Sequence, residues 1–102
     1  MNCLFVGAGA IATEYAAGLS DSPLSLAGVC DLDGERAAAL ADGHGCPSFT
    51  DLEAALGAAA APLVVNLTSH RSHSPVLRAA RSAHRHVLCQ DPLALVGFSA
   101  AG

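Results

Sequence analysis

Short apolar runs alternate along the chain with longer segments in which apolar residues recur at helical spacing. The short runs, with one brief extended piece, predict strands at residues 3–6, 24–30, 47–49, 63–67 and 87–89. The longer segments predict helices at residues 10–19, at 35–41, from 51 into the alanine-rich stretch before Pro62, and from 75 through 83. Strands that alternate with helices favour a parallel sheet with right-handed crossovers. We therefore expect an α/β fold, a doubly wound parallel sheet in three α-β-α layers, with residues 1–102 forming one domain.

Individual residues indicate where these elements begin, end and face the core. Asp33 can cap the second helix, and the breaker Gly43-His44-Gly45 ends it. Thr50 and Glu53 have the spacing of a capping box, which predicts Thr50 as the N-cap of the third helix. The face of the first helix that we expect to meet the core carries Ile11, Tyr15, Gly18 and Leu19.

The first strand runs directly into a glycine turn with the pattern G-x-G-x-x-A. This turn reads Gly7-Ala8-Gly9-Ala10-Ile11-Ala12 and opens the first helix. Gly7 makes the tight turn, Gly9 lets a pyrophosphate approach the backbone, and Ala12 is small enough for the helix to pack closely. Because the positive end of the helix faces the phosphates, we expect these six residues to bind a dinucleotide.

An acidic residue ends the second strand at the distance from this turn that a dinucleotide site requires. Asp31 follows Ala12 by 19 residues, close to the roughly 20 expected for the acid that holds a ribose 2′-hydroxyl. Leu32 and Arg36 complete the cofactor-binding residues expected here. A carboxylate disfavours the 2′-phosphate of NADP and the chain has no lysine, so we expect NAD rather than NADP; Arg36 softens this preference.

Two other interpretations of the glycine turn fit the sequence less well. Glycines also mark ordinary turns, but here a strand, a helix, a second strand and an acid all surround the pattern. A methyltransferase turn usually continues as G-x-G-x-G, whereas Ile11 occupies the last of those positions. The order of elements therefore favours a Rossmann-type NAD(P)-binding domain.

A polar segment follows the fourth strand, at the sheet edge where open α/β sheets bind their ligands. We expect residues 68–74 to form a loop that ends at Pro75, which suits the first turn of a helix. Taken alone, this loop fits a solvated helix cap as well as a cofactor contact. Its expected place beside the glycine turn favours cofactor contacts from Thr68, Ser69, His70 and His73.

Histidine and aspartate offer candidates for proton transfer. His70 and His73 have H-x-x-H spacing, but no nearby cysteine or carboxylate run supplies a third ligand, so we expect no metal. His73 is a candidate proton carrier because histidine titrates near neutrality. Asp91, within Gln90-Asp91-Pro92 at the end of the fifth strand, is a candidate acid or base. A plain Asp-Pro turn is the slightly favoured alternative there.

Composition narrows the class of protein. The chain has 52% hydrophobic and 14% charged residues, which excludes a disordered chain, and its net charge of −4 argues against nucleic-acid binding. No apolar run reaches the ~18 residues of a membrane span, and no basic segment at the start indicates a signal peptide. Four cysteines without a C-x-x-C pair, three of them in expected strands, indicate a reduced cytoplasmic protein.

Together the motifs resemble the N-terminal half of the Gfo/Idh/MocA oxidoreductases, over about residues 2–95. The family patterns V-G-x-G-x-I/A-A, V-x-D-x-D-x-x-R-A, D-x-E-x-x-L, T-P-N-x-x-H and A-G-K-H-V recur in chain order. The matching positions are Val6 to Ala12, Val29, Asp31, Asp33, Arg36, Ala37, Asp51, Glu53, Leu56, Thr68, His73, Ala83, His86 and Val87. This resemblance implies NAD(P) binding and hydride transfer between the nicotinamide and a sugar-like, polyol or carbonyl substrate.

The chain departs from this family at the E-K-P motif, where it has Gln90-Asp91-Pro92. The resemblance implies that Gln90 stands in place of the glutamate that contacts the nicotinamide ribose, and Asp91 in place of a catalytic lysine. Some family reductases also lack this lysine. The family's C-terminal substrate domain is missing as well, so we expect a truncated chain, or one whose second domain is supplied separately.

Two functions fit these observations. One is the cofactor domain of an oxidoreductase, which binds a small-molecule substrate only when a second domain is supplied. The other is a non-catalytic dinucleotide-binding module, which the reversed charge at Asp91 favours. In either case we expect a homo-oligomer, because a sheet without its partner domain exposes apolar surface.

Overall fold

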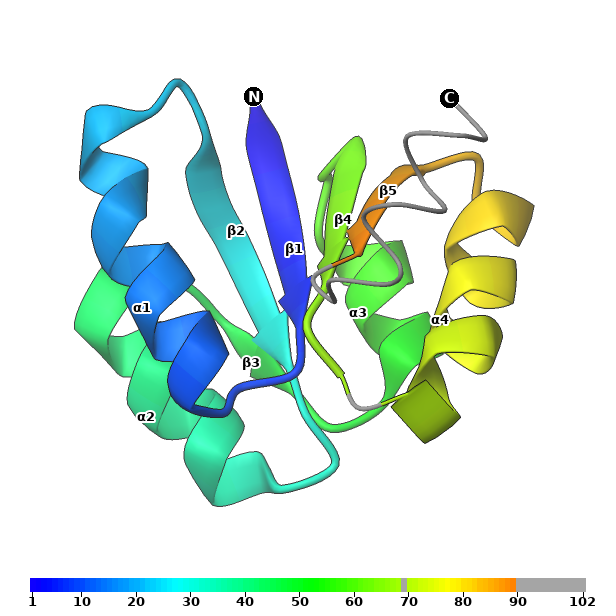
Figure 1. The fold of residues 1–102 in the computed structure, drawn as a ribbon, viewed down its shortest axis with the longest axis horizontal. Coiled ribbons are helices and arrows are strands. Elements are labelled where there is room, and N and C mark those ends of the chain that lie inside the picture. The colour runs from blue at the N-terminus through cyan, green and yellow to red at the C-terminus, as the bar shows by residue number, and fades with distance from the viewer. Residues whose placement is uncertain (69, 90–102) are drawn as a thin grey trace.

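Within residues 1–68 and 70–89, which the computed structural model describes, five parallel strands form one sheet in the order β3-β2-β1-β4-β5 (Figure 1). The strands are β1 (Asn2–Val6), β2 (Ser25–Cys30), β3 (Ser48–Phe49), β4 (Leu63–Asn66) and β5 (His86–Cys89). The helices are α1 (Ala10–Gly18), α2 (Gly34–His44), α3 (Leu52–Ala58) and α4 (His70–Ser82), with a short 3₁₀ helix η1 at Leu19–Asp21. The expected strands and helices are thus present in the expected order.

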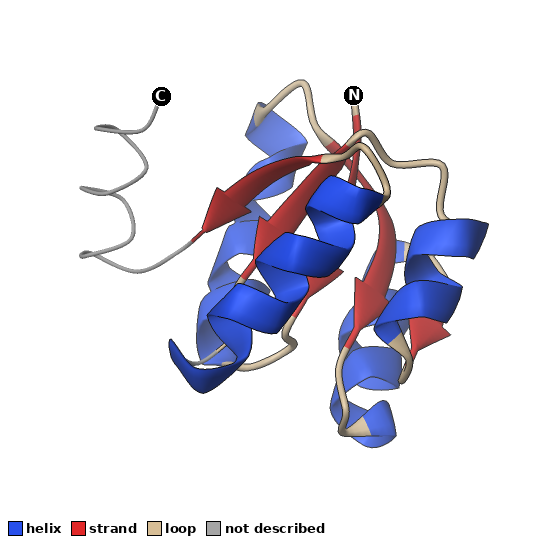
Figure 2. Ribbon diagram, turned by 90° about the vertical axis from the view of Figure 1, so that its right-hand side faces the viewer, coloured by secondary structure: helices blue, strands red, loops and turns tan. Residues whose placement is uncertain are grey.

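Helices cover both faces of the sheet (Figure 2). Successive residues of a strand point to opposite faces, so Phe5 and Leu4 of β1 enter different clusters. Phe5 packs in a cluster with residues of α1 and α2 that include Ala12. Leu4 packs in a second cluster with residues of α3 and α4 that include Leu56. The expected doubly wound sheet in three α-β-α layers is therefore confirmed.

The burial of β1 and β4 inside the sheet explains why their sequences are almost continuously apolar. The strand β1 has a neighbouring strand on each side and helices on both faces, and its residues from Cys3 to Val6 are at most 5% exposed. Val64 and Val65 of β4 are equally buried. The chain continues from β1 to one side and from β4 to the other, and this change of direction is the place where such sheets bind ligands.

The first helix meets the core through its alanines rather than through Ile11. Ala12 and Ala16 are buried, whereas Ile11 is 50% exposed and Gly18 is also exposed, so the expected core face is wrong at these two residues. Tyr15 and Leu19 are half-buried beside the alanines. Two small side chains let α1 lie close to the sheet, and the bulkier Ile11 consequently faces solvent.

The second helix begins as expected and ends later. The Asp33 side chain accepts hydrogen bonds from the N–H groups of Glu35 and Arg36, as an N-cap does. The helix continues past its expected end to His44. It stops there because Gly45, with φ of +67°, adopts the left-handed conformation that closes a helix.

The third helix is capped one residue later than expected. Thr50 is not its N-cap; instead, the Asp51 carboxylate accepts a hydrogen bond of 3.1 Å from the Ala54 N–H. Glu53 therefore lies one position too early in the helix to complete a capping box with this cap. A carboxylate is a good acceptor at a helix start, and its use leaves Thr50 beside the pocket described below.

The fourth helix begins earlier than the polar pattern indicates. Its first residue is His70, so most of the expected loop at 68–74 is helical, and Pro75 lies inside α4 rather than in its first turn. Proline lacks an N–H, but this near the helix start its presence removes only one hydrogen bond of the helical ladder. Burial of Val76 and Ala80 against the sheet holds the helix in place.

The cysteines behave as small apolar residues. Cys3 and Cys30 are buried in β1 and β2, Cys89 is half-buried in β5, and none of the four cysteines forms a disulfide. Burial raises the pKa of the Cys3 thiol.

No helix in the described part of the chain is long and apolar enough to cross a membrane.

Candidate dinucleotide-binding site

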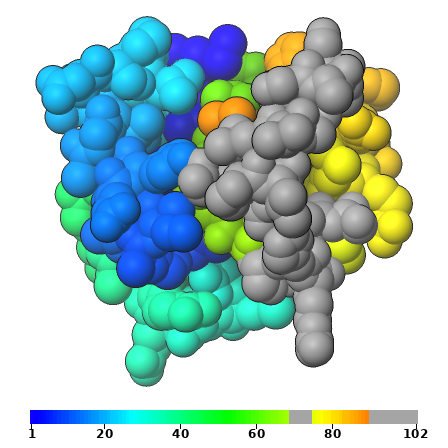
Figure 3. Space-filling model, in the orientation of Figure 1, coloured from blue at the N-terminus to red at the C-terminus, as the bar shows by residue number. Residues whose placement is uncertain are grey.

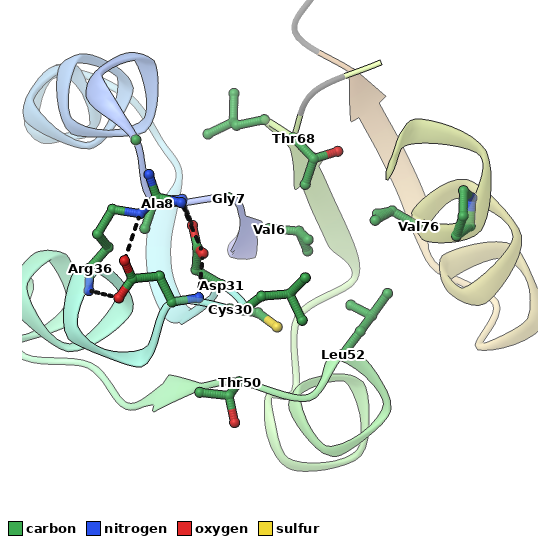
Figure 4. Close-up of a pocket in the computed structure, with 15 residues that line it drawn as sticks. Val6, Gly7, Ala8, Cys30, Asp31, Arg36, Thr50, Leu52, Thr68 and Val76 are labelled. Atoms are coloured by element: carbon green, nitrogen blue, oxygen red, sulfur yellow. Dashed lines mark hydrogen bonds and ion pairs between the residues drawn. The ribbon is translucent and has the colours of Figure 1, made fainter. Parts of the chain in front are cut away.

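A pocket of about 760 Å³ opens at the carboxyl ends of β1, β2 and β4 (Figure 4). In the space-filling view of Figure 3, the start of α1 and the segment that follows β2 lie next to each other at this edge of the molecule. The pocket brings together seven of the residues expected from the sequence to bind the cofactor. They are Gly7, Ala8, Gly9, Asp31, Leu32, Arg36 and Thr68.

The turn out of β1 requires glycine at its first position. Gly7 has φ of +104°, which L side chains rarely adopt, and a Cβ there would lie 2.8 Å from the carbonyl carbon and oxygen of Leu67. Its N–H donates to the carbonyl oxygen of Cys30 at 2.7 Å. Gly7 therefore joins the ends of β1, β2 and β4 at the pocket wall.

Gly9 borders open space at the start of α1. A Cβ added at Gly9 would meet no described atom within 4 Å. Gly9 is also the N-cap of α1, which has no side-chain cap and no acidic residue in its first turn. Because the first four N–H groups of a helix lack partners within it, the N–H groups of residues 9–12 are available to an anion at this end.

Asp31 connects three parts of the structure, two through its carboxylate and one through its backbone N–H. Its Oδ2 accepts a hydrogen bond of 2.8 Å from the Ala8 N–H in the glycine turn. Its Oδ1 accepts one of 2.8 Å from the Asp33 N–H, just before α2. The Asp31 N–H donates to the carbonyl oxygen of Phe49 at 3.0 Å and so joins β3. Figure 4 shows the carboxylate between the glycine turn and Arg36.

These contacts keep Asp31 ionised although its side chain is only 9% exposed. Burial alone would raise the pKa of the carboxyl group. The hydrogen bonds from the N–H groups of Asp33 and Ala8, together with the Arg36 guanidinium, outweigh burial, and the pKa is lowered from its ordinary value. The site therefore presents a fixed negative charge beside the glycine turn.

Arg36 pairs with this carboxylate from the outer side of the pocket. Its Nη2 atom lies 3.3 Å from Asp31 Oδ1 and 3.5 Å from Asp31 Oδ2, while its Nε atom lies 3.6 Å from Asp33 Oδ2. The Arg36 side chain is 58% exposed. Next to it, Leu32 is 92% exposed, an unusual position for a large apolar residue.

Sequence reasoning missed Asn66, which positions Thr68. Asn66 is fully buried at the end of β4, and its Oδ1 accepts hydrogen bonds from the Thr68 hydroxyl at 2.6 Å and the Thr68 N–H at 3.3 Å. The signal was visible in the sequence, since Asn66 is the one polar residue in the apolar run at 63–67. A buried amide of this kind is expected to have partners, and here one partner is a residue of the pocket.

One side of the pocket is apolar. Figure 4 shows Val6, Leu52 and Val76 converging there from β1, α3 and α4. The Cys30 thiol lies in the same wall, and burial, with the charges of Asp31 and Asp51, raises its pKa to about 11. This wall thus offers an uncharged surface that suits a flat apolar group.

Not every expected site residue lines the pocket with its side chain. Ala10 and Ile11 are exposed, Ala12 is buried in the core, and none of the three lines the pocket. Among the described side chains, no group of three or more histidines, cysteines, aspartates or glutamates could hold a metal ion. Outside the described residues lie Ser69, Gln90, Asp91 and the side chains of His70 and His73.

Comparison with known proteins identifies relatives of this chain. A family model described as "Oxidoreductase family, NAD-binding Rossmann fold", the Gfo/Idh/MocA family, matches residues 1–101. Inositol 2-dehydrogenase of Corynebacterium glutamicum is 34% identical over an alignment of 91 residues, and the match covers 86% of this chain and 27% of that enzyme.

Solved structures agree with this match. GenD2 from gentamicin A biosynthesis, solved in complex with NAD, has a TM-score of 0.84 and 30% identity over 91% of this chain and 27% of that chain. UDP-N-acetylglucosamine 3-dehydrogenase GnnA from Acidithiobacillus ferrooxidans has a TM-score of 0.77 and 29% identity over 87% of this chain and 28% of that chain.

The chain thus spans just over a quarter of the length of these relatives. The family match nevertheless covers almost all of this chain, and it includes the glycine turn and the acid that meet in the pocket. The chain therefore belongs to the Gfo/Idh/MocA oxidoreductase family and corresponds to its N-terminal, NAD-binding Rossmann domain.

Proposed function

We propose that this chain binds NAD or NADH at the carboxyl edge of its sheet and serves as the cofactor domain of an oxidoreductase. One observation carries the proposal: a single pocket contains both the open helix N-terminus at Gly9 and the nearly buried carboxylate of Asp31. These two groups match the two demands of a dinucleotide, an anionic pyrophosphate and a ribose whose hydroxyls donate hydrogen bonds.

The pyrophosphate is proposed to lie against the first turn of α1. The N–H groups of residues 9–12 donate to it, and Gly9 leaves the space that a phosphate needs. The Ala8 N–H does not take part, because it donates to Asp31. The helix dipole adds about 0.3–1 kcal/mol to anion binding at such a place.

The adenosine half is proposed to lie on the side of β2. Asp31 accepts hydrogen bonds from the ribose, and the apolar wall at Leu52 and Val76 receives the base. Leu32 lies at the rim of the same pocket, and a bound base would cover part of its exposed side chain. Removing that apolar surface from water stabilises the complex by roughly 25 cal/mol per Å².

The nicotinamide half is proposed to lie toward β4. The Thr68 hydroxyl donates to Asn66, so its oxygen presents lone pairs to a ligand. We extend the proposal to Ser69, His70, His73 and Gln90 as further cofactor contacts and to His73 or Asp91 as a proton carrier. When bound, NAD supplies the hydride chemistry, while this chain holds and orients it.

The proposed substrate is a polyol, a sugar-like alcohol or the corresponding carbonyl compound. Support comes from the names of two relatives, an inositol 2-dehydrogenase and a UDP-N-acetylglucosamine 3-dehydrogenase. Because this chain spans about 27% of the first of these, we propose that a second domain completes the substrate pocket. We further propose that the protein is cytoplasmic and that it forms homo-oligomers. Light scattering after size-exclusion chromatography tests the oligomeric state.

A second candidate function is a dinucleotide-binding module without catalysis. The observation that favours it is the absence of lysine from the whole chain, with Asp91 at the position of the catalytic lysine that the family resemblance implies. A module of this kind binds NADH through Gly9 and Asp31 in the same way. It differs only in transferring no hydride.

Calorimetric titration with NADH tests the binding that both candidates share. We expect saturable binding by the wild-type chain, a loss of more than tenfold in affinity for Asp31→Ala, and no change for Asp42→Ala, an exposed aspartate of α2 outside the pocket. Absence of saturable binding would exclude NAD as the ligand. NADH absorbance with a panel of polyols then separates the candidates, because turnover by this chain excludes the module.

A further inference from the structure

Arg36 is bound to Asp31 where the proposed function needs the ribose to bind. The Arg36 Nη2 atom bridges both carboxylate oxygens, at 3.3 and 3.5 Å. The N–H groups of Ala8 and Asp33 already donate to the same two oxygens, each at 2.8 Å. A carboxylate has about four lone-pair sites, so two backbone donors and a bridging guanidinium together engage all of them.

A ribose must therefore displace one of these donors, and Arg36 is held least firmly. The N–H groups of Ala8 and Asp33 belong to the glycine turn and to the segment that caps α2, so neither can leave without remodelling the backbone. The Arg36 side chain is 58% exposed, and its distances to Asp31 exceed the roughly 2.7–2.9 Å of strong charged hydrogen bonds.

We propose that Arg36 competes with the adenosine ribose for Asp31, and that cofactor binding turns its guanidinium off the carboxylate. This inference rests on the proposed function. Asp33, whose Oδ2 lies 3.6 Å from Arg36 Nε, keeps the displaced side chain near the ribose. The freed cation then stands where the 2′-phosphate of NADP would lie. Arg36 consequently weakens the binding of NAD and strengthens the binding of NADP.

The variant Arg36→Met separates these two effects, because methionine keeps an apolar stem and removes the charge. We expect NADH to bind roughly two- to fivefold more tightly, the range that loss of an exposed ion pair supports. We expect NADPH to bind at least roughly fivefold more weakly, since its 2′-phosphate loses a charged partner. Calorimetric titration measures both constants, and circular dichroism checks that the variant is folded.

A matched variant controls for net charge. Arg81→Met makes the same change of charge on an exposed residue of α4 that does not line the pocket. We expect both dissociation constants to stay at their wild-type values. Equal shifts in the two variants would mean that Arg36 acts only through the overall charge and would overturn the inference.

Comparison of ADP with 2′-deoxy-ADP isolates the competition from the attraction of Arg36 for phosphates. If Arg36 competes with the ribose, Arg36→Met tightens ADP binding and leaves 2′-deoxy-ADP no tighter. If Arg36 only attracts phosphates, both ligands weaken together, and the inference is wrong. Wild-type protein that binds NADH, with Arg36→Met unchanged toward NADH, would overturn this inference alone. Wild-type protein that binds neither NADH nor ADP would overturn the proposed function as well.

Discussion

The Ala8 N–H donates a 2.8 Å hydrogen bond to Asp31 Oδ2 and thereby ties the glycine turn to the end of β2. The two residues are 23 positions apart in the sequence, and both line the pocket. The acid that is proposed to hold the ribose therefore also holds the shape of the phosphate turn. Stability and cofactor binding should respond together when this carboxylate changes.

The variant Asp31→Asn tests this coupling. The N–H groups of Ala8 and Asp33 donate to different oxygens of the carboxylate, and in an amide one of these oxygens is replaced by an NH2 donor, so one of the two N–H groups loses its acceptor. We expect the free energy of unfolding to fall by about 1–3 kcal/mol, the usual cost of leaving a buried donor without a partner. Urea unfolding measures this loss, and NADH affinity should fall in the same variant. Asp42→Asn, on the exposed side of α2, should behave as wild type.

The two glycines of the turn should separate stability from binding. A Cβ at Gly7 meets the Leu67 backbone at 2.8 Å and requires φ of +104°, so Gly7→Ala should lower the free energy of unfolding by more than about 2 kcal/mol. Gly9 has φ of −81° and open space around it, so Gly9→Ala should leave stability within about 1 kcal/mol of wild type.

At Gly9, substitution should weaken NADH binding although it leaves stability nearly unchanged. The added methyl group occupies space that is proposed for the pyrophosphate, so Gly9→Ala should weaken NADH binding by roughly tenfold, the scale of about 1.4 kcal/mol. Thermal unfolding and calorimetric titration of the same preparation measure both quantities. A Gly9→Ala protein that is stable and binds NADH normally would show that the pyrophosphate does not approach this residue.

Much of the fold could be predicted because a few short sequence patterns each fit only one kind of local structure. The run from Cys3 to Val6 has to be buried on both faces, which requires a middle strand with helices on each side. The spacing from Gly7 to Asp31 then requires one helix and one strand between them, and the two ends meet as expected. Sequence patterns work well where one physical need allows few residue types.

The errors arise where several residues satisfy the same need. Thr50 and Asp51 can both cap a helix, and the sequence does not tell which oxygen reaches the N–H of Ala54. Ile11 fits a helical stripe as well as Ala12 does, but only packing distance decides which of them faces the sheet. Pairing between side chains on different elements, such as Arg36 in α2 with Asp31 at the end of β2, depends on how the elements pack, which the sequence pattern does not contain.

Acid should destabilise the protein in part through Asp31. Its pKa in the folded protein lies below the ordinary 3.8, because hydrogen bonds and Arg36 outweigh burial. The contribution of the carboxylate is therefore fully present above pH 3.8 and is lost as the pH falls through the folded pKa. The difference in unfolding free energy between wild type and Asp31→Asn should be constant above this pH and shrink below it. A difference that grows with acid would contradict the assignment.

Alkali should destabilise the protein in part through Cys30. Burial raises the pKa of its thiol from 9.0 to about 11, so the stability that the neutral thiol contributes is complete below pH 9.0 and is lost as the pH rises toward 11. The expected loss is about 2–3 kcal/mol at about 1.4 kcal/mol per pKa unit. In the Cys30→Ala variant, the free energy of unfolding, measured with urea at increasing pH, should fall less between pH 9.0 and 11 than in the wild type. Cys46→Ala, at a half-buried position outside the pocket, should reduce this alkaline loss of stability less than Cys30→Ala does.

Thr68 should matter through its hydroxyl group rather than through its shape. The hydroxyl donates a 2.6 Å hydrogen bond to the buried Asn66 and leaves its lone pairs to the pocket. Thr68→Val keeps the shape and removes both functions, so we expect a loss of about 1 kcal/mol in unfolding free energy and a severalfold weaker NADH affinity. Thr68→Ser keeps the hydroxyl and should stay near wild type in urea unfolding and calorimetry. Equal losses in the two variants would indicate that the methyl group, not the hydroxyl, holds the end of β4 in place.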